Sequence, residues 1–124
     1  MPETAPDFIS TNPLLDQIKE LALEKKAKRL IAIDVRGLSA ITDFFIICHG
    51  DSEPQVKAIT DNIRKGTPHK PLHLEGYESM NWILLDYLDI VVHVFKRELR
   101  DYYHLEKMWA DTPIKEFMDE KSEA

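Results

Sequence analysis

Residues 82–95 read WILLDYLDIVVHVF, two apolar runs that a short break separates. The runs extend from Trp82 to Tyr87 and from Ile90 to Phe95, and they are rich in the β-branched and aromatic residues that favour strands. Because only two residues lie between the runs, we expect an antiparallel hairpin. The hairpin predicts a fold that is built around a sheet.

Helical and strand patterns alternate in the chain before this hairpin. Asn12 can cap a helix that has Pro13 in its first turn, where a missing backbone N–H costs nothing. The apolar residues that follow at helical spacing are Leu14, Leu15, Ile18, Leu21 and Ala22. Residues 30–35 predict a strand, and residues 44–48 are apolar on both alternating faces, as in a central strand covered on two sides.

A second helix and a short strand connect these elements to the hairpin. Ser52 and Gln55 have the spacing of a capping box at the start of the second helix. Gly66 and Pro68 are typical of the end of that helix. Residues 71–75 then predict a short strand. The two apolar residues on one of its faces are Leu72 and Leu74.

The last predicted helix follows the hairpin and ends near Pro113. Its apolar stripe consists of Leu99, Tyr102, Leu105 and Trp109. The tail from Ile114 is polar and acidic, and we expect at most one further turn there. That turn would contain Ile114, Phe117 and Met118.

The expected order of elements is α-β-β-α-β-β-β-α. This order predicts an α/β domain with a mixed, mainly five-stranded sheet and helices packed on it. We divide the 124 residues into a flexible N-terminal segment (1–12), one domain (13–112) and an acidic C-terminal tail (113–124). One domain is the number that this length favours.

Targeting signals and compartment are read from the chain start and the cysteine content. The first seven residues contain two acids, and the first basic residue is Lys19, which is unlike a secretory signal or an organelle transit peptide. No apolar run approaches the roughly 20 residues that cross a bilayer. Cys48 is the only cysteine, so no intramolecular disulfide can form and a reducing compartment is favoured. We therefore expect a cytoplasmic protein.

The charge balance favours a protein partner over nucleic acid. The chain has 22 acidic and 16 basic residues, a formal net charge of −6. Nucleic-acid affinity depends mostly on Lys and Arg that neutralise phosphates, so we expect no dedicated nucleic-acid site. An acidic protein suits a basic partner because opposite fields speed encounter. Solubility alone also explains a mildly acidic surface.

One motif invites an enzymatic interpretation. Gly50-Asp51-Ser52 follows a strand and precedes a capped helix, as in nucleotide-transferring domains that hold phosphate at a helix N-terminus. Such enzymes also need two acids at i, i+2 on a neighbouring strand to hold magnesium. Asp86 and Asp89 are three apart, so an extended strand would put them on opposite faces. The capping interpretation is therefore favoured, and we expect no catalytic residues.

The histidines and the cysteine give no metal or nucleophile pattern. His69 and His73 are four apart, but Pro71 between them excludes a helical pair. His93 lies among valines and is expected to be a core or half-buried histidine with a local hydrogen bond. Cys48 is expected to be an inert buried thiol. We expect no metal site and no cofactor.

Aromatic and charged residues near the hairpin are better candidates for partner binding. Trp82 and Asp86 are four apart on a strand, so they share one face. Tyr103 and Lys107 are four apart on the last helix and also share a face. Tyr and Trp are enriched at binding hot spots. From spacing alone, an anchoring role for Trp82 and Tyr103 and a packing role both stay open.

A basic cluster begins the last helix, where it opposes the helix dipole. Its members are Lys96, Arg97 and Arg100. These cations either pair with Asp86 or Asp89 or meet a partner, and the sequence does not choose between the two.

Together these residues resemble the Iojap family, the ribosomal silencing factors, from about residue 14 to residue 112. The resemblance depends on Asp34, Ser39, Thr42-Asp43-Phe44-Phe45, Gly50-x-Ser52-x-x-Gln55, Lys57-Ala58-Ile59, Glu75-Gly76, Trp82, Asp86-Tyr87-x-Asp89, Val91-Val92-His93-Val94-Phe95, Arg100 and Tyr103-x-Leu105-Glu106-x-x-Trp109.

The resemblance implies a nucleotidyltransferase-like fold without the catalytic acids, and a function without chemistry. Such proteins bind ribosomal protein fourteen of the large subunit and block the small subunit from joining, which represses translation when nutrients are scarce. Family members often form homodimers. The partner-binding positions that the resemblance implies are Trp82, Leu85, Asp86, Tyr103 and Lys107. Leu85 is expected on the strand face opposite to Trp82 and Asp86.

The chain departs from the family pattern at two positions. Leu88 stands where the family usually has Gly, which questions a turn with positive φ there. Met108 replaces a usual Leu, a change that conserves volume. Two other functions stay as alternatives, a nucleotide-binding enzyme that resembles nucleotidyltransferases and a ribosome-assembly factor that binds ribosomal RNA.

Overall fold

The computed structural model describes residues 12–36, 42–103 and 114–117. Its elements, in chain order, are α2 (Pro13–Glu24), β1 (Lys28–Asp34), β2 (Phe44–Gly50), α3 (Glu53–Gly66), β3 (His73–Glu75), β4 (Trp82–Asp86), β5 (Ile90–Lys96), α4 (Arg97–Tyr103) and β6 (Ile114–Phe117). The predicted order is confirmed as far as α4. No helix in these ranges is long and apolar enough to span a membrane.

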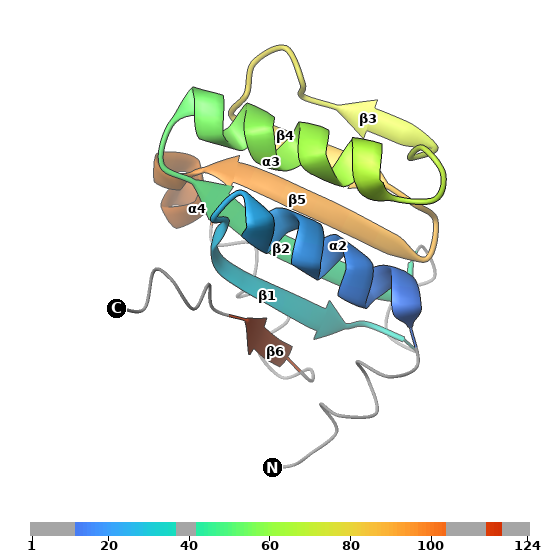
Figure 1. Ribbon diagram of the computed structural model, residues 1–124. Helices are drawn as coiled ribbons and strands as arrows, with labels where there is room; N and C mark the ends of the chain where they lie inside the picture. The colour runs from blue at the N-terminus through green and yellow to red at the C-terminus, as the bar shows by residue number, and fades with distance from the viewer. Residues whose placement is uncertain (1–11, 37–41, 104–113, 118–124) are drawn as a thin grey trace.

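The strands form one mixed sheet in the order β3-β4-β5-β2-β1-β6. β2 and β5 are parallel, and every other neighbouring pair is antiparallel. Helices α2 and α3 lie side by side on one face of the sheet, and α4 lies at the end of β5 (Figure 1). This arrangement confirms the predicted mixed α/β class and the β4–β5 hairpin.

The main core lies between the sheet and the pair α2 and α3. Alternate residues of the strands point to these helices, which follows from the two-residue period of a strand. The helices contribute Leu15, Ile18, Ala22, Val56, Ile59 and Ile63, and the central strands contribute Phe44, Ile46, Cys48, Ile90, Val92 and Val94. Cys48 is fully buried, and burial raises the pKa of its thiol to about 12. The prediction that the Cys48 thiol is buried is therefore confirmed.

The start of α3 is fixed by its own side chains. The Ser52 hydroxyl accepts the Gln55 N–H at 3.3 Å, as a capping box requires. The side-chain oxygen of Gln55, Oε1, accepts the backbone N–H of Asp51 (2.7 Å) rather than that of Ser52. The side-chain nitrogen of Gln55, Nε2, donates to the backbone carbonyl of Lys26 (2.9 Å). A Cβ at Gly50 would lie 3.0 Å from the Val56 backbone nitrogen, so glycine lets the helix approach the strand.

The C-terminal tail corrects one expectation. The helical turn that we expected around Ile114 and Phe117 is wrong, because residues 114–117 form β6. This strand pairs antiparallel with β1, with Leu30 opposite Phe117 and Ile33 opposite Ile114. Pairing through the backbone satisfies hydrogen-bonding groups of β1 that would otherwise form an open sheet edge. The five expected strands are therefore joined by a sixth.

Candidate functional site

Two of the candidate partner-binding residues, Trp82 and Asp86, lie on the sheet face that α2 and α3 do not cover. Trp82, Leu84 and Asp86 alternate on β4 with Ile83 and Leu85. The first three are half-buried, and the other two are fully buried in the main core. We call Trp82, Leu84 and Asp86 the outer row of β4. The prediction that Trp82 and Asp86 share a face is confirmed.

Leu85 has no surface to offer a partner in this structure. Its exposed fraction is 0%, and it packs with the residues under α3. We therefore correct the expected direct contact at Leu85 to a supporting role in the core. Tyr103 is the last residue of α4, and Lys107 lies outside the described residues. The structure thus brings together Trp82 and Asp86 of the five predicted residues.

Aromatic neighbours hold Trp82 in place. Its ring stacks on Phe95 with a centroid distance of 4.9 Å, and its indole N–H donates to Nδ1 of His93 at 3.1 Å. Phe45 contacts the His93 ring edge-on at 5.3 Å. The predicted local hydrogen bond of His93 is therefore confirmed. The bond fixes one orientation of the indole, so Trp82 has a packing role in this structure.

His93 is neutral at physiological pH. The residue is 5% exposed, and burial lowers the pKa of its imidazole to about 4. Because Nδ1 accepts the indole N–H of Trp82, the ring proton lies on Nε2. Nε2 has no hydrogen-bond partner among the described residues. Protonation of His93 would remove the acceptor that orients Trp82.

A tight turn that requires glycine precedes β4. Gly76 has φ of +80°, and a Cβ there would lie 2.0 Å from the carbonyl oxygen of Trp82. The carbonyl of Gly76 accepts the N–H of Met80 at 3.2 Å, which closes the turn. Only glycine combines this backbone conformation with this approach. Gly76 was part of the family resemblance, but its role in placing Trp82 required the structure.

Asp86 connects two exposed leucines at the other end of β4. Its carboxylate accepts the N–H of Leu88 at 2.8 Å, and its backbone carbonyl accepts the N–H of Leu72 at 2.7 Å. Leu72 and Leu88 are each 60% exposed. Two exposed leucines beside one acid form a partly apolar surface that residue spacing did not predict, because Leu72 joins it through a backbone contact.

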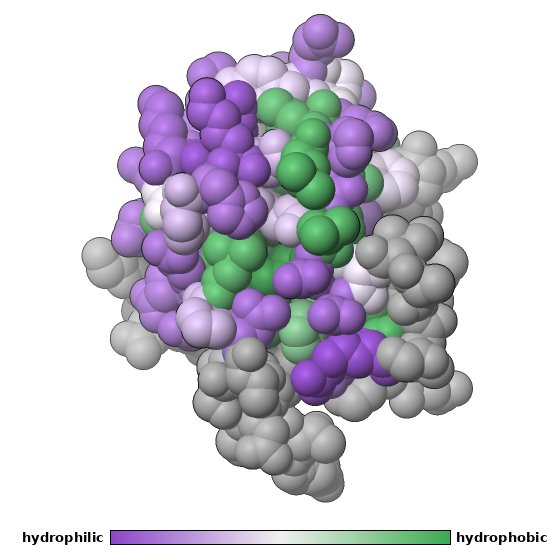
Figure 2. Space-filling view, turned by 90° about the vertical axis from the view of Figure 1, so that its right-hand side faces the viewer, coloured by the Kyte–Doolittle hydropathy of each residue, from purple (hydrophilic) through white to green (hydrophobic). Residues whose placement is uncertain are grey.

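The end of the molecule that carries Leu72 and Leu88 is where α3 ends and β4 turns into β5. Figure 2 views this end and shows apolar side chains at the surface between polar ones. Leu88 has φ of +81°. The turn therefore has the positive φ that glycine would favour, although leucine stands at this position. The Asp89 N–H bonds to the Tyr87 carbonyl (3.0 Å) across Leu88 and holds this turn.

The basic cluster has local partners. Lys96 forms an ion pair with Glu53 at 3.4 Å. Arg100 is 1% exposed, and it donates to the carbonyl of Arg29 at 2.7 Å. Lys96 bonds to Asn81 at the open end of the β4–β5 hairpin. Asp86 pairs with Val91 near the turn of the hairpin, so the basic cluster and the two acids lie at opposite ends. The suggested pairing with these two acids is therefore wrong.

The nucleotide-binding interpretation of the α3 start has no support among the described residues. These residues contain no group of three His, Cys, Asp or Glu that could hold a metal ion. At the start of α3, where a nucleotide phosphate would bind, the side chains of Ser52 and Gln55 take backbone N–H groups. The side chain of Asp86 accepts from the turn rather than facing this helix start.

The chain is similar to proteins of one family. The family model described as "Ribosomal silencing factor during starvation" matches residues 9–124. Ribosomal silencing factor RsfS from Halalkalibacterium halodurans is 43% identical over 111 residues, which cover 87% of this chain and 95% of that protein.

Two solved structures have the same fold. A crystal structure of a protein from Chromobacterium violaceum has a TM-score of 0.76 at 32% identity, with 78% of this chain and 83% of that chain covered. A crystal structure from Bacillus halodurans has a TM-score of 0.74 at 42% identity, with 84% and 97% covered.

The fold and the outer row of β4 define a small mixed α/β domain with an aromatic and acidic sheet face. The family model covers most of the chain and supplies the identity. The chain belongs to the ribosomal silencing factor family, RsfS. This family is regulatory and not enzymatic, and it implies association with the ribosome, so the resemblance found in the sequence is confirmed.

Proposed function

We propose that this protein binds the large ribosomal subunit through its ribosomal protein fourteen and sterically blocks the small subunit from joining. The outcome is repression of translation when nutrients are limiting. The observation that carries the proposal is the outer row of β4, Trp82, Leu84 and Asp86, with the exposed Leu72 and Leu88 beside it. Family membership supplies the ribosome as the target.

The composition of this surface supports a protein partner. Trp82 offers a large ring in a fixed orientation, because Phe95 and His93 already hold it, and a fixed anchor loses little entropy on binding. Leu72 and Leu88 add apolar area at the end of the row. Asp86 adds a negative charge, in a chain whose net charge is −6, for a basic partner.

The mechanism needs no chemistry. A competitor that buries roughly 1,600 Å² in total, with a few central anchors, is specific enough to occupy a docking surface. While it is bound, the small subunit cannot contact that surface. The extent of repression then depends on the protein's concentration relative to its dissociation constant for the large subunit.

Three parts of the proposal extend from the family resemblance. Tyr103 and Lys107 are proposed as further contacts from the last helix. A homodimer is proposed as the free form, which sedimentation of the purified protein tests. A cytoplasmic location is proposed because ribosomes that translate in the cytoplasm are the target.

Binding of purified large subunits tests the site. Trp82→Ala and Asp86→Lys are each expected to weaken binding at least about 30-fold, because each removes a central anchor. Cosedimentation over a concentration series measures the dissociation constant. Thermal unfolding of each variant verifies that it is folded, since Trp82 also packs on Phe95.

Two control variants separate binding from folding. Asp86→Asn keeps an acceptor for the Leu88 N–H and removes the charge, so it is expected to weaken binding less than Asp86→Lys does. Glu78→Lys changes the net charge as much as Asp86→Lys does, at an exposed residue of the β3–β4 turn, and is expected to bind like wild type. Wild-type affinity in folded Trp82→Ala and Asp86→Lys would refute the site.

A further inference from the structure

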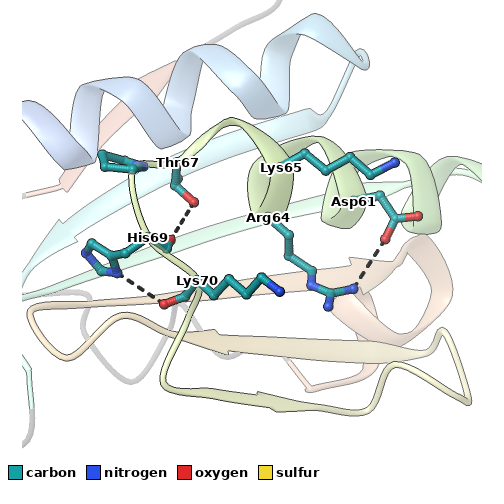
Figure 3. Close-up of a pocket in the computed structure, with 7 residues that line it drawn as sticks. Asp61, Arg64, Lys65, Thr67, His69 and Lys70 are labelled. Carbon is teal, nitrogen blue, oxygen red and sulfur yellow. Dashed lines mark hydrogen bonds and ion pairs between the residues drawn. The ribbon is translucent and has the colours of Figure 1, made fainter.

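A pocket opens at the end of α3 and in the loop that leads to β3. It has a volume of about 460 Å³, and we call it the α3 corner pocket. Its lining residues are Asp61, Arg64, Lys65, Thr67, Pro68, His69 and Lys70. Figure 3 shows the side chain of Lys70 extending toward that of Arg64, while the side chain of Lys65 extends along α3 away from the loop. None of these residues belongs to the outer row of β4.

The pocket is locally basic in an acidic protein. Its three cations, Arg64, Lys65 and Lys70, face one acid, Asp61, so the lining has a formal charge of +2. Lys65 and Lys70 are exposed, and within the described residues neither forms an ion pair. The net charge of the whole chain is −6, so this corner differs in sign from the average surface.

The one acid of the pocket is already used. The Asp61 carboxylate accepts the hydroxyl of Tyr77 at 2.8 Å and pairs with Lys57 at 2.8 Å. Burial alone would raise the pKa of Asp61, but the hydrogen bonds from Lys57 and Tyr77 outweigh it and lower the pKa. Arg64 is farther from this carboxylate, at 3.7 Å. Asp61 therefore leaves the pocket's lysines without a counter-charge.

The helix dipole explains part of the cluster. Arg64 and Lys65 lie in the last turn of α3, where cations are favourable. Lys70 lies four residues beyond the helix, outside the reach of that effect, and its side chain lines the same pocket. Cations that converge on one cavity repel one another unless an anion lies between them. Three cations that line one pocket therefore favour an anionic ligand.

The loop that carries Lys70 is held in one position. The Thr67 hydroxyl lies 3.0 Å from the carbonyl of Ile63, 3.0 Å from the carbonyl of His69 and 3.0 Å from the hydroxyl of Tyr87. The His69 ring packs edge-on against Tyr87 at 5.7 Å. A fixed loop loses little conformational entropy when a ligand binds.

The pocket adjoins the surface of the proposed function. Lys70 is two residues before Leu72, whose N–H binds the backbone carbonyl of Asp86. Tyr87, which contacts Thr67 and His69, directly precedes Leu88. The edge of a partner that covers Leu72 and Leu88 would therefore lie next to the cations of the pocket.

We propose that the α3 corner pocket binds a phosphodiester group of ribosomal RNA that lies beside the protein partner. The proposal deepens the proposed function and rests on it. Lys65 and Lys70 contact the phosphate oxygens, and Arg64 adds charge from the pocket wall. The contact is subordinate to the protein interface, which agrees with the chain's acidic balance.

The lining favours a backbone phosphate over a free nucleotide. Pro68 is the only apolar residue of the lining. The Tyr77 ring nearby already faces the cations of Arg64 (5.4 Å) and Lys57 (5.9 Å), so it does not offer a base an open stacking surface. His69 supplies the one aromatic ring of the lining, and this ring already packs edge-on against Tyr87, so the charged residues favour the phosphate group.

The salt dependence of large-subunit binding tests the proposal. The double variant Lys65→Gln/Lys70→Gln is compared with Lys25→Gln/Lys26→Gln, which removes the same charge beside the opposite end of α3, where Gln55 binds the carbonyls of Lys25 and Lys26. The pocket variant is expected to bind large subunits about 10-fold more weakly and to reduce the slope of log K against log salt by about 1 to 2. The control variant is expected to keep the wild-type slope.

Two further measurements identify the ligand. The pocket variant is expected to bind isolated ribosomal protein fourteen like wild type, because the lost contact is to RNA. Added AMP at constant ionic strength is expected to leave subunit affinity unchanged. An equal loss for the isolated protein would assign the pocket to the protein interface, and displacement by AMP would assign it to a free nucleotide; either result overturns the proposal.

The two proposals fail differently. If wild type binds large subunits and the two double variants have the same affinity and slope, the phosphate contact is wrong and the protein interface stands. If wild type does not bind large subunits, both proposals fail together.

Discussion

His93 and Trp82 form a unit in which one buried residue orients one half-buried residue. The indole N–H of Trp82 needs the unprotonated Nδ1 of His93 as its acceptor. Because burial keeps the pKa of His93 at about 4, the neutral form persists over the pH range in which cells live. The orientation of Trp82 is therefore insensitive to ordinary changes of pH.

Stability below neutral pH should depend on His93. Its pKa is about 4 in the folded protein and about 6.5 in the unfolded chain, so between these values the unfolded chain binds more protons. The folded state therefore loses stability as the pH falls through this window. Between about pH 7 and about pH 5 we expect the contribution of His93 to fall by about 2 kcal/mol. Urea unfolding at both pH values measures it.

A comparison of variants isolates this effect from the titration of the carboxylates. His93→Gln is expected to lose less stability than wild type over the same pH range, and the exposed His73→Gln is expected to behave like wild type. Parallel pH profiles for wild type and His93→Gln would contradict a depressed pKa at His93.

Leu88 is strained, and its side chain contributes little to the core. A non-glycine residue with φ of +81° costs about 1 to 3 kcal/mol, and the residue is 60% exposed. Glycine removes the strain but loses more chain entropy, about 0.5 to 1 kcal/mol. We therefore expect Leu88→Gly to raise the free energy of unfolding by about 1 kcal/mol, measured by chemical denaturation at neutral pH.

The same variant also probes the proposed surface. If Leu88 contacts the partner, Leu88→Gly is more stable but binds large subunits more weakly. Leu88→Ala keeps the positive φ and is expected to gain no stability. A gain for alanine equal to that for glycine would show that strain is not the cause.

At the scale of elements, side-chain periodicity predicted the strands whose faces are buried. The hairpin of β4 and β5 and the central strand β2 carry long apolar runs, and all were confirmed. The two-residue repeat of side chains along a strand also predicted that Trp82 and Asp86 share one face and that Leu85 lies on the other. These features depend on which side chains are buried, and the pattern of apolar residues in the sequence indicates this directly.

Contacts made by the backbone could not be predicted in this way. β6 reads Ile-Lys-Glu-Phe, too short to distinguish a strand from a helical turn, and it is defined by pairing with β1. Leu72 joins the candidate surface through one N–H bond to Asp86, and Gly76 through its close approach to Trp82. These contacts join residues that are distant in the sequence, and no pattern of side chains in the sequence predicts them.

Removal of β6 should leave a folded but weaker protein. Four residues of β6 are in register with β1, and a typical net contribution is about 0.5 to 1.5 kcal/mol per hydrogen bond. A chain that ends at Pro113 is expected to lose about 2 to 4 kcal/mol of stability. Chemical denaturation of the truncated and complete chains measures the difference, and a chain ending at Met118 serves as the control. Equal stability of all three would mean that β6 contributes nothing to the fold.

At the scale of the whole molecule, two surfaces of opposite charge lie at one end. The outer row of β4 ends at Asp86 with exposed leucines, and the α3 corner pocket carries Lys65 and Lys70. The net charge of the whole chain, −6, therefore does not show how charge is distributed between these two surfaces. A ribosomal protein embedded in RNA offers basic side chains and phosphates next to each other, which is the combination that these two surfaces would match.

The rate at which large and small subunits form complete ribosomes tests the central claim most directly. Light scattering follows association after purified subunits are mixed, with the protein first incubated with the large subunit. The account predicts that association slows as the protein's concentration rises and nearly stops at saturation, while Asp86→Lys at the same concentration has little effect. Association at an undiminished rate, with the protein bound to every large subunit, would contradict it.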